Sequence, residues 1–268
     1  MNLLRVDPTR TTTLTKRFVA DLRRRFRALS DAVIDFFVEL DALGLKERVR
    51  LIFLASQERE FEFRDDVGKL EAFKQWLEQQ IEILILSGSL AAYIRAAYIR
   101  GLINAHFAAR RGDITDQSQE DFLTSSLRDP EVLNKLQLIT ARAEDSLKGV
   151  AAALSAEAAK ILADGLISRA TPDQIAADLA ARISSLAETK ALGIARAEVV
   201  STHAEGQLDG FERLGIRQLT IRAEWVTAGD DKVCKQCASF EGQKFSIDEA
   251  RGMIPLHPNC RCSWILTT

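Results

Sequence analysis

The sequence is poor in proline and nearly balanced in charge, and no cysteine occurs before residue 234. Only five of its 268 residues are proline. Because proline disrupts helices, whereas the abundant alanine, leucine, glutamate and arginine lose little entropy in them, this composition favours helical structure. The 38 acidic and 36 basic residues leave a net charge of -2, which argues against a protein that coats nucleic acid through general positive charge.

Long hydrophobic runs and familiar catalytic motifs are also lacking. The longest uncharged apolar stretch, 83–94, is shorter than the roughly 20 residues that cross a bilayer. Arg5, Asp7 and Arg10 interrupt the N-terminal segment where a signal peptide needs an apolar core. The sequence contains no H-E-x-x-H, no G-x-S-x-G and no glycine-rich phosphate loop. We therefore expect a protein that is made in the cytoplasm, has no membrane partner and is not an enzyme.

Hydrophobic spacing predicts a mostly helical chain. Apolar residues recur at steps of three and four residues, as in amphipathic helices, over 14–43, 69–109, 131–167 and 189–214. Thr171-Pro172-Asp173-Gln174 predicts the start of a further helix, to about residue 186, because it combines an N-cap, proline in the first turn and a capping box. Two departures are expected near the N-terminal half: a short hairpin within 49–64 and an acidic break at 65–68.

The C-terminal end has a different pattern. Leu219, Ile221, Ala223 and Trp225 alternate with polar residues, which predicts a strand, and Phe245 and 263–266 suggest further short strands. The expected fold class is therefore mainly α with a small C-terminal β unit, an α+β protein with a helical body and a Cys-rich, cross-linked end at 219–268. Along the chain we expect a helical region at 1–111, a polar connector at 112–130 and a second domain at 131–268.

All four cysteines lie in this end, as Cys234-x-x-Cys237 and Cys260-x-Cys262, with His257 three residues before the second pair. Two close pairs separated by a loop suit a tetrahedral metal site, because each pair delivers two thiolates to one point. Five donors compete for four positions, so we take the four cysteines as zinc ligands and His257 as a reserve ligand. Disulfides and free thiols remain alternatives, although a reducing cytoplasm favours a metal.

Together with these cysteines, Trp225, Gly229-Asp230-Asp231, Gly242 and the string Pro255-x-His257-Pro258-x-Cys260-Arg261-Cys262 resemble the C-terminal signature of tailed-phage head morphogenesis proteins, the MuF-like minor capsid family. Upstream, Arg196-Ala197-Glu198 with Thr202 resembles the Arg-x-Glu helix of that family. The resemblance covers about residues 130–266 and makes 131–268 the head morphogenesis domain. Residues 1–129 carry no motif that we can assign.

The resemblance implies a structural minor head protein of a tailed phage or prophage, associated with the portal and acting in head assembly or genome delivery. Its partners would be the portal protein and other head proteins, and several copies would lie in the virion, inside the capsid or at the portal. Trp225 is expected to have a structural role. Arg196 and Glu198 are two residues apart on a helix and face different partners, and we expect one of them to tie that helix to the Cys-rich end.

An alternative function is a zinc-ribbon module that contacts packaged DNA. Its phosphate contacts would come from basic residues near the cysteines, namely Lys232, Lys235, Lys244, Arg251 and Arg261. An equal number of nearby acidic residues offsets them, which weakens the local positive field: Asp230, Asp231, Glu241, Asp248 and Glu249. A second basic cluster, at 23–27 of the first predicted helix, is interpreted as a solvated outer face.

Overall fold

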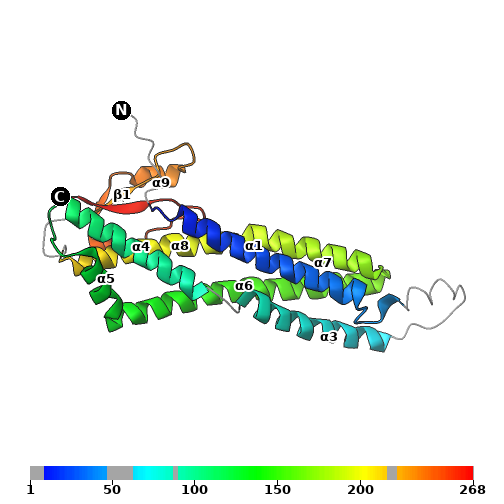
Figure 1. Cartoon of the computed structure of the whole chain (residues 1–268). Helices are drawn as coiled ribbons and strands as arrows, with labels where there is room; N and C mark the ends of the chain where they lie inside the picture. The colour runs from blue at the N-terminus through cyan, green and yellow to red at the C-terminus, as the bar shows by residue number, and fades with distance from the viewer. Residues whose placement is uncertain (1–8, 47–62, 87–89, 216–221, 268) are drawn as a thin grey trace, which may run out of the picture. The chain divides into compact units, whose positions relative to one another are not determined.

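The structure is a computed structural model that describes residues 9–46, 63–86, 90–215 and 222–267 (Figure 1). Most of this part is helical: α1 Thr12–Ile34, α3 Phe63–Ile81, α4 Leu90–Arg111, α5 Gln119–Arg128, α6 Pro130–Ser168, α7 Pro172–Leu186, α8 Leu192–Arg213, α9 Lys235–Phe240 and α10 Ile247–Ala250. The strands are β1 Arg222–Val226, β2 Lys244–Phe245 and β3 Ser263–Thr267. The predicted class, mainly α with a small C-terminal β unit, is confirmed.

The helix boundaries agree with the sequence where a local signal is strong. Thr171 caps α7, and both bonds of the capping box are present: its hydroxyl accepts from the Gln174 amide, and the Gln174 side chain accepts from the Thr171 amide. Such a cap stabilises a helix by about 1 kcal/mol. The long helix predicted at 131–167 is observed as α6.

Other boundaries differ from the prediction. The break expected at 65–68 lies inside α3, which begins at Phe63, and the hairpin expected within 49–64 lies almost wholly outside the described residues. The expected connector at 112–130 contains α5, which buries Phe122. Between α7 and α8 the chain makes a π-helical turn, η3 Ala187–Ala191, where the sequence predicts a break between two helices. Two further π-helical turns, η1 Asp35–Glu39 and η2 Glu82–Leu86, follow α1 and α3.

The described chain forms two compact units. The first comprises Met1–Val19, Ser89–Glu144 and Gly193–Thr268, and the second comprises Ala20–Gly88 and Asp145–Leu192. Each unit is built from separate stretches of chain, so α1 and α6 contribute to both. The division along the chain that the sequence suggests, with a connector at 112–130, stays a prediction.

The second unit has an aromatic core. The Phe36 ring lies 4.2 Å from that of Trp76, and Phe37 lies 5.3 Å from Phe73, measured between ring centroids. Arg23 forms a two-bond ion pair with Glu188 on its surface, at 2.7 and 2.8 Å. Arg24 and Arg25 both pair with Asp21. Three arginines of the basic cluster are thus balanced by carboxylates of the same unit.

In the first unit, glycines allow α4 and α8 to pack with their backbones in close contact. A Cβ atom added at Gly206 would approach the Tyr98 backbone closer than 3.0 Å, and one added at Gly101 would meet the backbone of α8 equally closely. At Gly210 the added atom would collide with the Ala105 side chain. Larger side chains at these three positions would force the helices apart.

The sheet completes the first unit, with strand order β2-β1-β3 and antiparallel pairing throughout. Trp225 pairs with Trp264 across β1 and β3, and both indole rings are buried, at 0% and 1% exposure. They meet edge to face with ring centroids 5.3 Å apart, one of the favoured geometries of aromatic pairs. Trp225 is thus part of the buried core of this unit.

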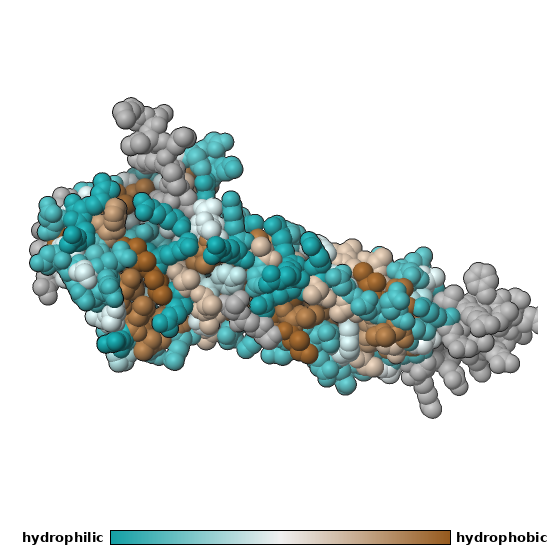
Figure 2. Space-filling view, viewed as in Figure 1, coloured by the Kyte–Doolittle hydropathy of each residue, from teal (hydrophilic) through white to brown (hydrophobic). Residues whose placement is uncertain are grey.

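Hydrophilic side chains cover most of the face shown in Figure 2, with hydrophobic patches between them. Among the described residues, one helical stretch, Asp66–Arg111, is long and apolar enough to cross a membrane by length and composition. Core helices of soluble proteins meet the same criterion. One part of this stretch, α4, contributes to the core of the first unit. Its Ile94, Tyr98 and Leu102 are fully buried in a cluster with Phe122 of α5 and Val132 of α6.

The close contact of α4 and α8 yields a stability prediction. Gly206→Ala should lower the free energy of unfolding by about 3 kcal/mol, because the new methyl group meets rigid backbone. Gly193→Ala in the same helix is the matched control, since a Cβ atom there has no neighbour within 4 Å. This second change should stabilise the protein by about 0.5–1 kcal/mol. Urea titrations of the two variants measure both values, and equal effects would contradict the described packing.

Candidate metal centre

The first cysteine pair is positioned by the start of α9. Cys234 is the N-cap residue of this helix, and its sulfur accepts a hydrogen bond from the Cys237 amide at 3.3 Å. An N-cap side chain folds back toward the first helical turn, so this bond directs both sulfurs to the same side. The C-x-x-C spacing thereby becomes a two-sulfur site.

The second pair lies at the entry to β3, in a turn that also carries His257. The Cys260 amide donates to the His257 carbonyl at 3.1 Å. The His257 Nδ1 atom lies 2.8 Å from the Pro258 carbonyl, which can only accept, so Nδ1 carries the proton. Nε2 then presents its lone pair to the sulfurs, and a carbonyl bonded to the second nitrogen is the usual support of a metal-binding histidine.

These turns bring all five predicted donors together. Nε2 of His257 lies 3.3 Å from the Cys234 sulfur and 3.1 Å from the Cys237 sulfur, and the Cys237 and Cys260 sulfurs are 3.9 Å apart. A zinc ion with bonds of about 2.3 Å holds tetrahedral sulfurs about 3.8 Å apart, whereas a disulfide needs about 2.05 Å. None of the four cysteines is in a disulfide. The spacing therefore fits an ion held between thiolates.

The donors form two overlapping triads that share Cys237. Cys234, Cys237 and His257 make one, and Cys237, Cys260 and Cys262 make the other, with the ligand atoms of each within 4.8 Å of one another. His257 thus contacts two of the sulfurs directly and is as well placed to bind an ion as the cysteines are. Which four of the five donors bind stays a prediction, and Cys237 is the donor common to both triads.

The protonation of the cluster also suits a cation. A hydrogen bond with Cys262 is the main cause that lowers the pKa of Cys260, to about 5. Burial, followed by the charge of Cys260, raises the pKa of Cys237 to about 12. The hydrogen bond with Cys260 and burial raise the pKa of Cys262 above its usual range. Burial and the mutual charge of the sulfurs thus oppose ionisation of all three at once, and a divalent ion would allow its ligands to ionise.

Space and burial limit what the cluster can do. Cys237, Cys260 and Cys262 are only 2–3% exposed. The cavity that the cluster borders has a volume of about 10 Å³ and is lined by Cys234, Cys237, His257 and Cys262, among others. This volume is close to the minimum that holds one water molecule. The cavity is thus of a size that suits a single ion.

Gln207 of α8 attaches the described part of the Cys-rich end, residues 222–267, to the helices of the first unit. Its side-chain nitrogen donates to the Trp264 carbonyl at 3.1 Å, and its side-chain oxygen accepts from the Trp264 amide at 3.3 Å and from the Ser263 hydroxyl at 2.8 Å. The primary amide thus bonds to β3 as a neighbouring strand would. Gln207 is 3% exposed, so water does not compete for these bonds.

An ion cluster on the same helix makes the second attachment. Arg251, just after α10, reaches Glu205, Asp209 and Glu212 of α8 at 3.1, 2.7 and 2.6 Å. Lys135 of α6 contacts Asp209 at 2.7 Å, and the Tyr98 hydroxyl donates to Asp209 at 2.5 Å. Asp209 is therefore a buried charge with several partners from separate elements.

Arg196 and Glu198, which the sequence suggested as this link, lie elsewhere on α8. Glu198 pairs with Arg142 of α6 at 2.8 Å. The contacts of α8 with the Cys-rich end described above come from Glu205, Gln207, Asp209 and Glu212, which belong to no motif noted in the sequence. Their one signal is that Glu205, Asp209 and Glu212 recur at four- and three-residue steps along α8, a pattern that is easily taken for a solvated face.

Asp209 gives a pH-dependent prediction. Burial alone would raise its pKa, but Lys135, Tyr98 and Arg251 outweigh burial and hold the pKa below its ordinary value. A depressed carboxyl pKa contributes stability that is complete above the unfolded value, about 3.9, and is lost as the pH falls toward the folded value. Asp209→Asn should therefore lower the free energy of unfolding by about 3 kcal/mol at pH 7. Below about pH 4 the stability of the variant should fall less steeply with pH than that of the unchanged protein.

Thermal unfolding between pH 3 and pH 7 measures this effect, with the exposed Asp178→Asn in α7 as the control. An Asp209→Asn variant with the stability and pH profile of the unchanged protein would show that the ion cluster contributes nothing.

The donor cluster predicts one zinc ion per chain. Cys237→Ser should abolish zinc binding because both triads lose a ligand, whereas Lys235→Ala in the same turn should leave it unchanged. Comparing His257→Ala with Cys262→Ser identifies the fourth ligand, since only the true ligand should weaken binding strongly. Elemental analysis and zinc titration provide the readout. Stoichiometric zinc on Cys237→Ser, or none on the unchanged protein after reduction, would refute the site.

Comparison with known proteins gives one match. Residues 135–265 match the family described as Phage Mu protein F like protein. No curated protein and no solved structure matches the chain. The matched range begins within α6 and ends within β3, so it includes α8, the donor cluster and both attachments described above. The resemblance inferred from the sequence is thereby confirmed over residues 135–265, which form a Phage Mu protein F like region.

Proposed function

We propose that this protein is a structural minor head protein of a tailed phage or prophage, which associates with the portal and acts in head assembly or genome delivery. The observation that carries the proposal is the family match, because it spans most of α6, all of α7 and α8, and nearly all of the Cys-rich end as one continuous region. The portal and other head proteins would be its partners, in several copies per virion, in the capsid interior or at the portal.

In this proposal the donor cluster is a structural clamp. Three of its four cysteines are buried, and its cavity is about the size of one ion, which suits a structural site without an open position for a substrate. Zinc would be held by Cys237 with three of Cys234, His257, Cys260 and Cys262. When bound, the ion supplies cross-linking rather than catalysis, and its binding free energy stabilises a sheet too small to fold alone.

The alternative, direct contact with packaged DNA, has less support. Arg261 forms a two-bond ion pair with Asp230, with both N–O distances 2.6 Å, and Arg251 is bound by three carboxylates of α8. Arginines already bound to carboxylates would have to lose those partners to bind phosphate. Two of the five basic residues considered for DNA are thus committed to the fold, which favours the structural role.

Incorporation into particles tests the proposal. In the phage or prophage that encodes the protein, a Cys237→Ser/Cys260→Ser double variant should be depleted from purified heads, because the Cys-rich end loses its cross-link. Lys235→Ala, an exposed change in the same turn, should be incorporated normally. Quantitative mass spectrometry of purified heads gives the copy number.

A pull-down with purified portal protein tests the expected partner: the portal protein should retain the unchanged protein. Absence of the unchanged protein from virions, or normal incorporation of a chain that lacks 222–267, would contradict the proposed function.

A further inference from the structure

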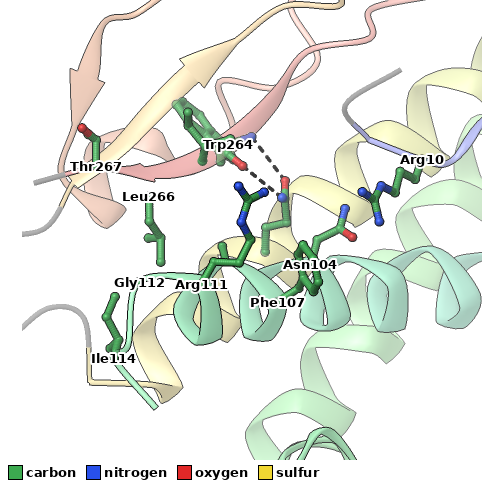
Figure 3. Close-up of a pocket in the computed structure, with 12 residues that line it drawn as sticks. Arg10, Asn104, Phe107, Arg111, Gly112, Ile114, Trp264, Leu266 and Thr267 are labelled. Atoms are coloured by element: carbon green, nitrogen blue, oxygen red, sulfur yellow. Dashed lines mark hydrogen bonds between the residues drawn. The ribbon is translucent and has the colours of Figure 1, made fainter. Parts of the chain in front are cut away.

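The outer edge of β3 borders a groove of about 640 Å³ in the first unit, between this strand and the C-terminal half of α4 (Figure 3). Phe107, Arg111 and Gly112 line it from α4 and the following turn, Trp264 to Thr267 line it from β3, and Arg10 lies at one end. The donor cluster and the acidic cluster around Asp209 contribute no residue to it.

The pairing of the sheet shows which backbone groups face this groove. The Trp225 amide and carbonyl bond to Gln243 and Gly242, on the β2 side of β1. In antiparallel pairing, alternate residues turn their backbone groups to opposite sides. Trp264, the partner of Trp225, therefore turns its amide and carbonyl away from β1, as its bonds to Gln207 confirm.

Leu266, two residues further along β3, must turn its backbone groups in the same direction as Trp264. Within the described part of the chain, neither the Leu266 amide nor its carbonyl has a hydrogen-bond partner. Gln207 thus occupies one position of the strand edge and leaves the next one open. An open strand edge is a template for a further strand.

The charges around the groove are of one sign. Its lining includes Arg10 and Arg111 and no acidic residue, although the chain as a whole has a net charge of -2. Both guanidinium groups lie over the Phe107 ring, 5.8 and 5.9 Å from its centroid. Neither pairs with a carboxylate among the described residues.

Arg10 is held in place by its neighbours. It has a positive φ of 52°, which is uncommon for a residue other than glycine. Thr9 and Thr11 on either side are buried, at 1% and 2% exposure, and Arg100 of α4 donates to the Arg10 carbonyl at 3.0 Å. The exposed side chain therefore extends from a fixed backbone toward the groove, as Figure 3 shows.

We propose that this groove binds an extended, acidic segment of another protein, which adds to β3 as an antiparallel or parallel fourth strand. The Leu266 amide and carbonyl would bond to its backbone, and Arg10 and Arg111 would bind its carboxylates. A peptide fits better than single-stranded nucleic acid, whose bases need exposed aromatic rings to stack on. The guanidinium groups of Arg10 and Arg111 already lie over the Phe107 ring, and the Trp264 ring is buried. This inference does not depend on the proposed function.

Binding of short fluorescent peptides to the full chain, measured by anisotropy at low salt, tests the proposal. The probe is an eight-residue peptide in which valine alternates with glutamate. Two control peptides have the same length: one replaces glutamate with lysine, and the other replaces valine with proline, which cannot pair with a strand edge. The acidic strand-forming peptide should bind at least about tenfold more tightly than either control, and added salt should weaken it.

Variants separate the backbone contact from the charges. Leu266→Pro removes the outward amide but no bond to β1, so it should weaken binding by about tenfold, whereas Leu266→Ala should change it by less than about threefold. Arg10→Glu/Arg111→Glu should abolish binding. Near-UV circular dichroism checks that the tryptophan core of each variant is intact.

If Leu266→Pro alters that spectrum, Arg10→Glu/Arg111→Glu decides the test alone. Failure of the acidic peptide to bind, equal binding of either control peptide, or tighter binding of an oligothymidine of similar length would overturn the proposal.

Discussion

One face of α8 holds the first unit together, and the rest of that unit depends on it. Glycines on this helix let α4 pack with its backbone in contact, Gln207 bonds to the β3 edge at Trp264, and Asp209 binds cations from α6 and from the Cys-rich end. Each contact requires the others. If α4 moved outward, Tyr98 would leave Asp209, and a buried carboxylate would then lose a hydrogen bond that it needs.

The Cys-rich end needs this support because it is small. Its strands are short, and β2 contains only Lys244 and Phe245. A sheet of this size buries too little apolar surface to be stable by itself. Two features compensate: the sulfur and imidazole donors suit a cross-linking ion, and Trp225 and Trp264 belong to the same buried cluster as Ala204, Leu208 and Phe211 of α8. The proposed clamp thus stabilises the end internally, while α8 holds it to the helices.

The sequence predicted well where a short pattern determines a local structure. The capping box at Thr171 and Gln174, the alternation around Trp225 and the cysteine spacing all depend on residues near one another in the chain. The link between α8 and the Cys-rich end could not be predicted in this way. Gln207 and Trp264 are 57 residues apart, and no local pattern distinguishes an amide that bonds to a strand from one in water.

The misplaced boundaries have a similar cause. Asp65-Asp66-Val67-Gly68 is a plausible helix break by propensity, yet α3 continues through it, since propensity is a weak guide when an amphipathic face can be buried. Likewise Glu198 belonged to the expected family motif, but its partner Arg142 is in α6 rather than in the Cys-rich end. Motifs identified the right helix, and only the structure identified the residues that connect it.

We expect the donor cluster, the sheet and α8 to unfold as one cooperative structure. Native-state hydrogen exchange of the zinc-loaded full chain, before and after removal of the metal by a chelator, tests it most directly. We expect the amides of β1, β3 and the second half of α8 to lose protection together when zinc is removed. If the sheet amides become exposed while α8 keeps its full protection, or if chelation changes neither, the account is contradicted.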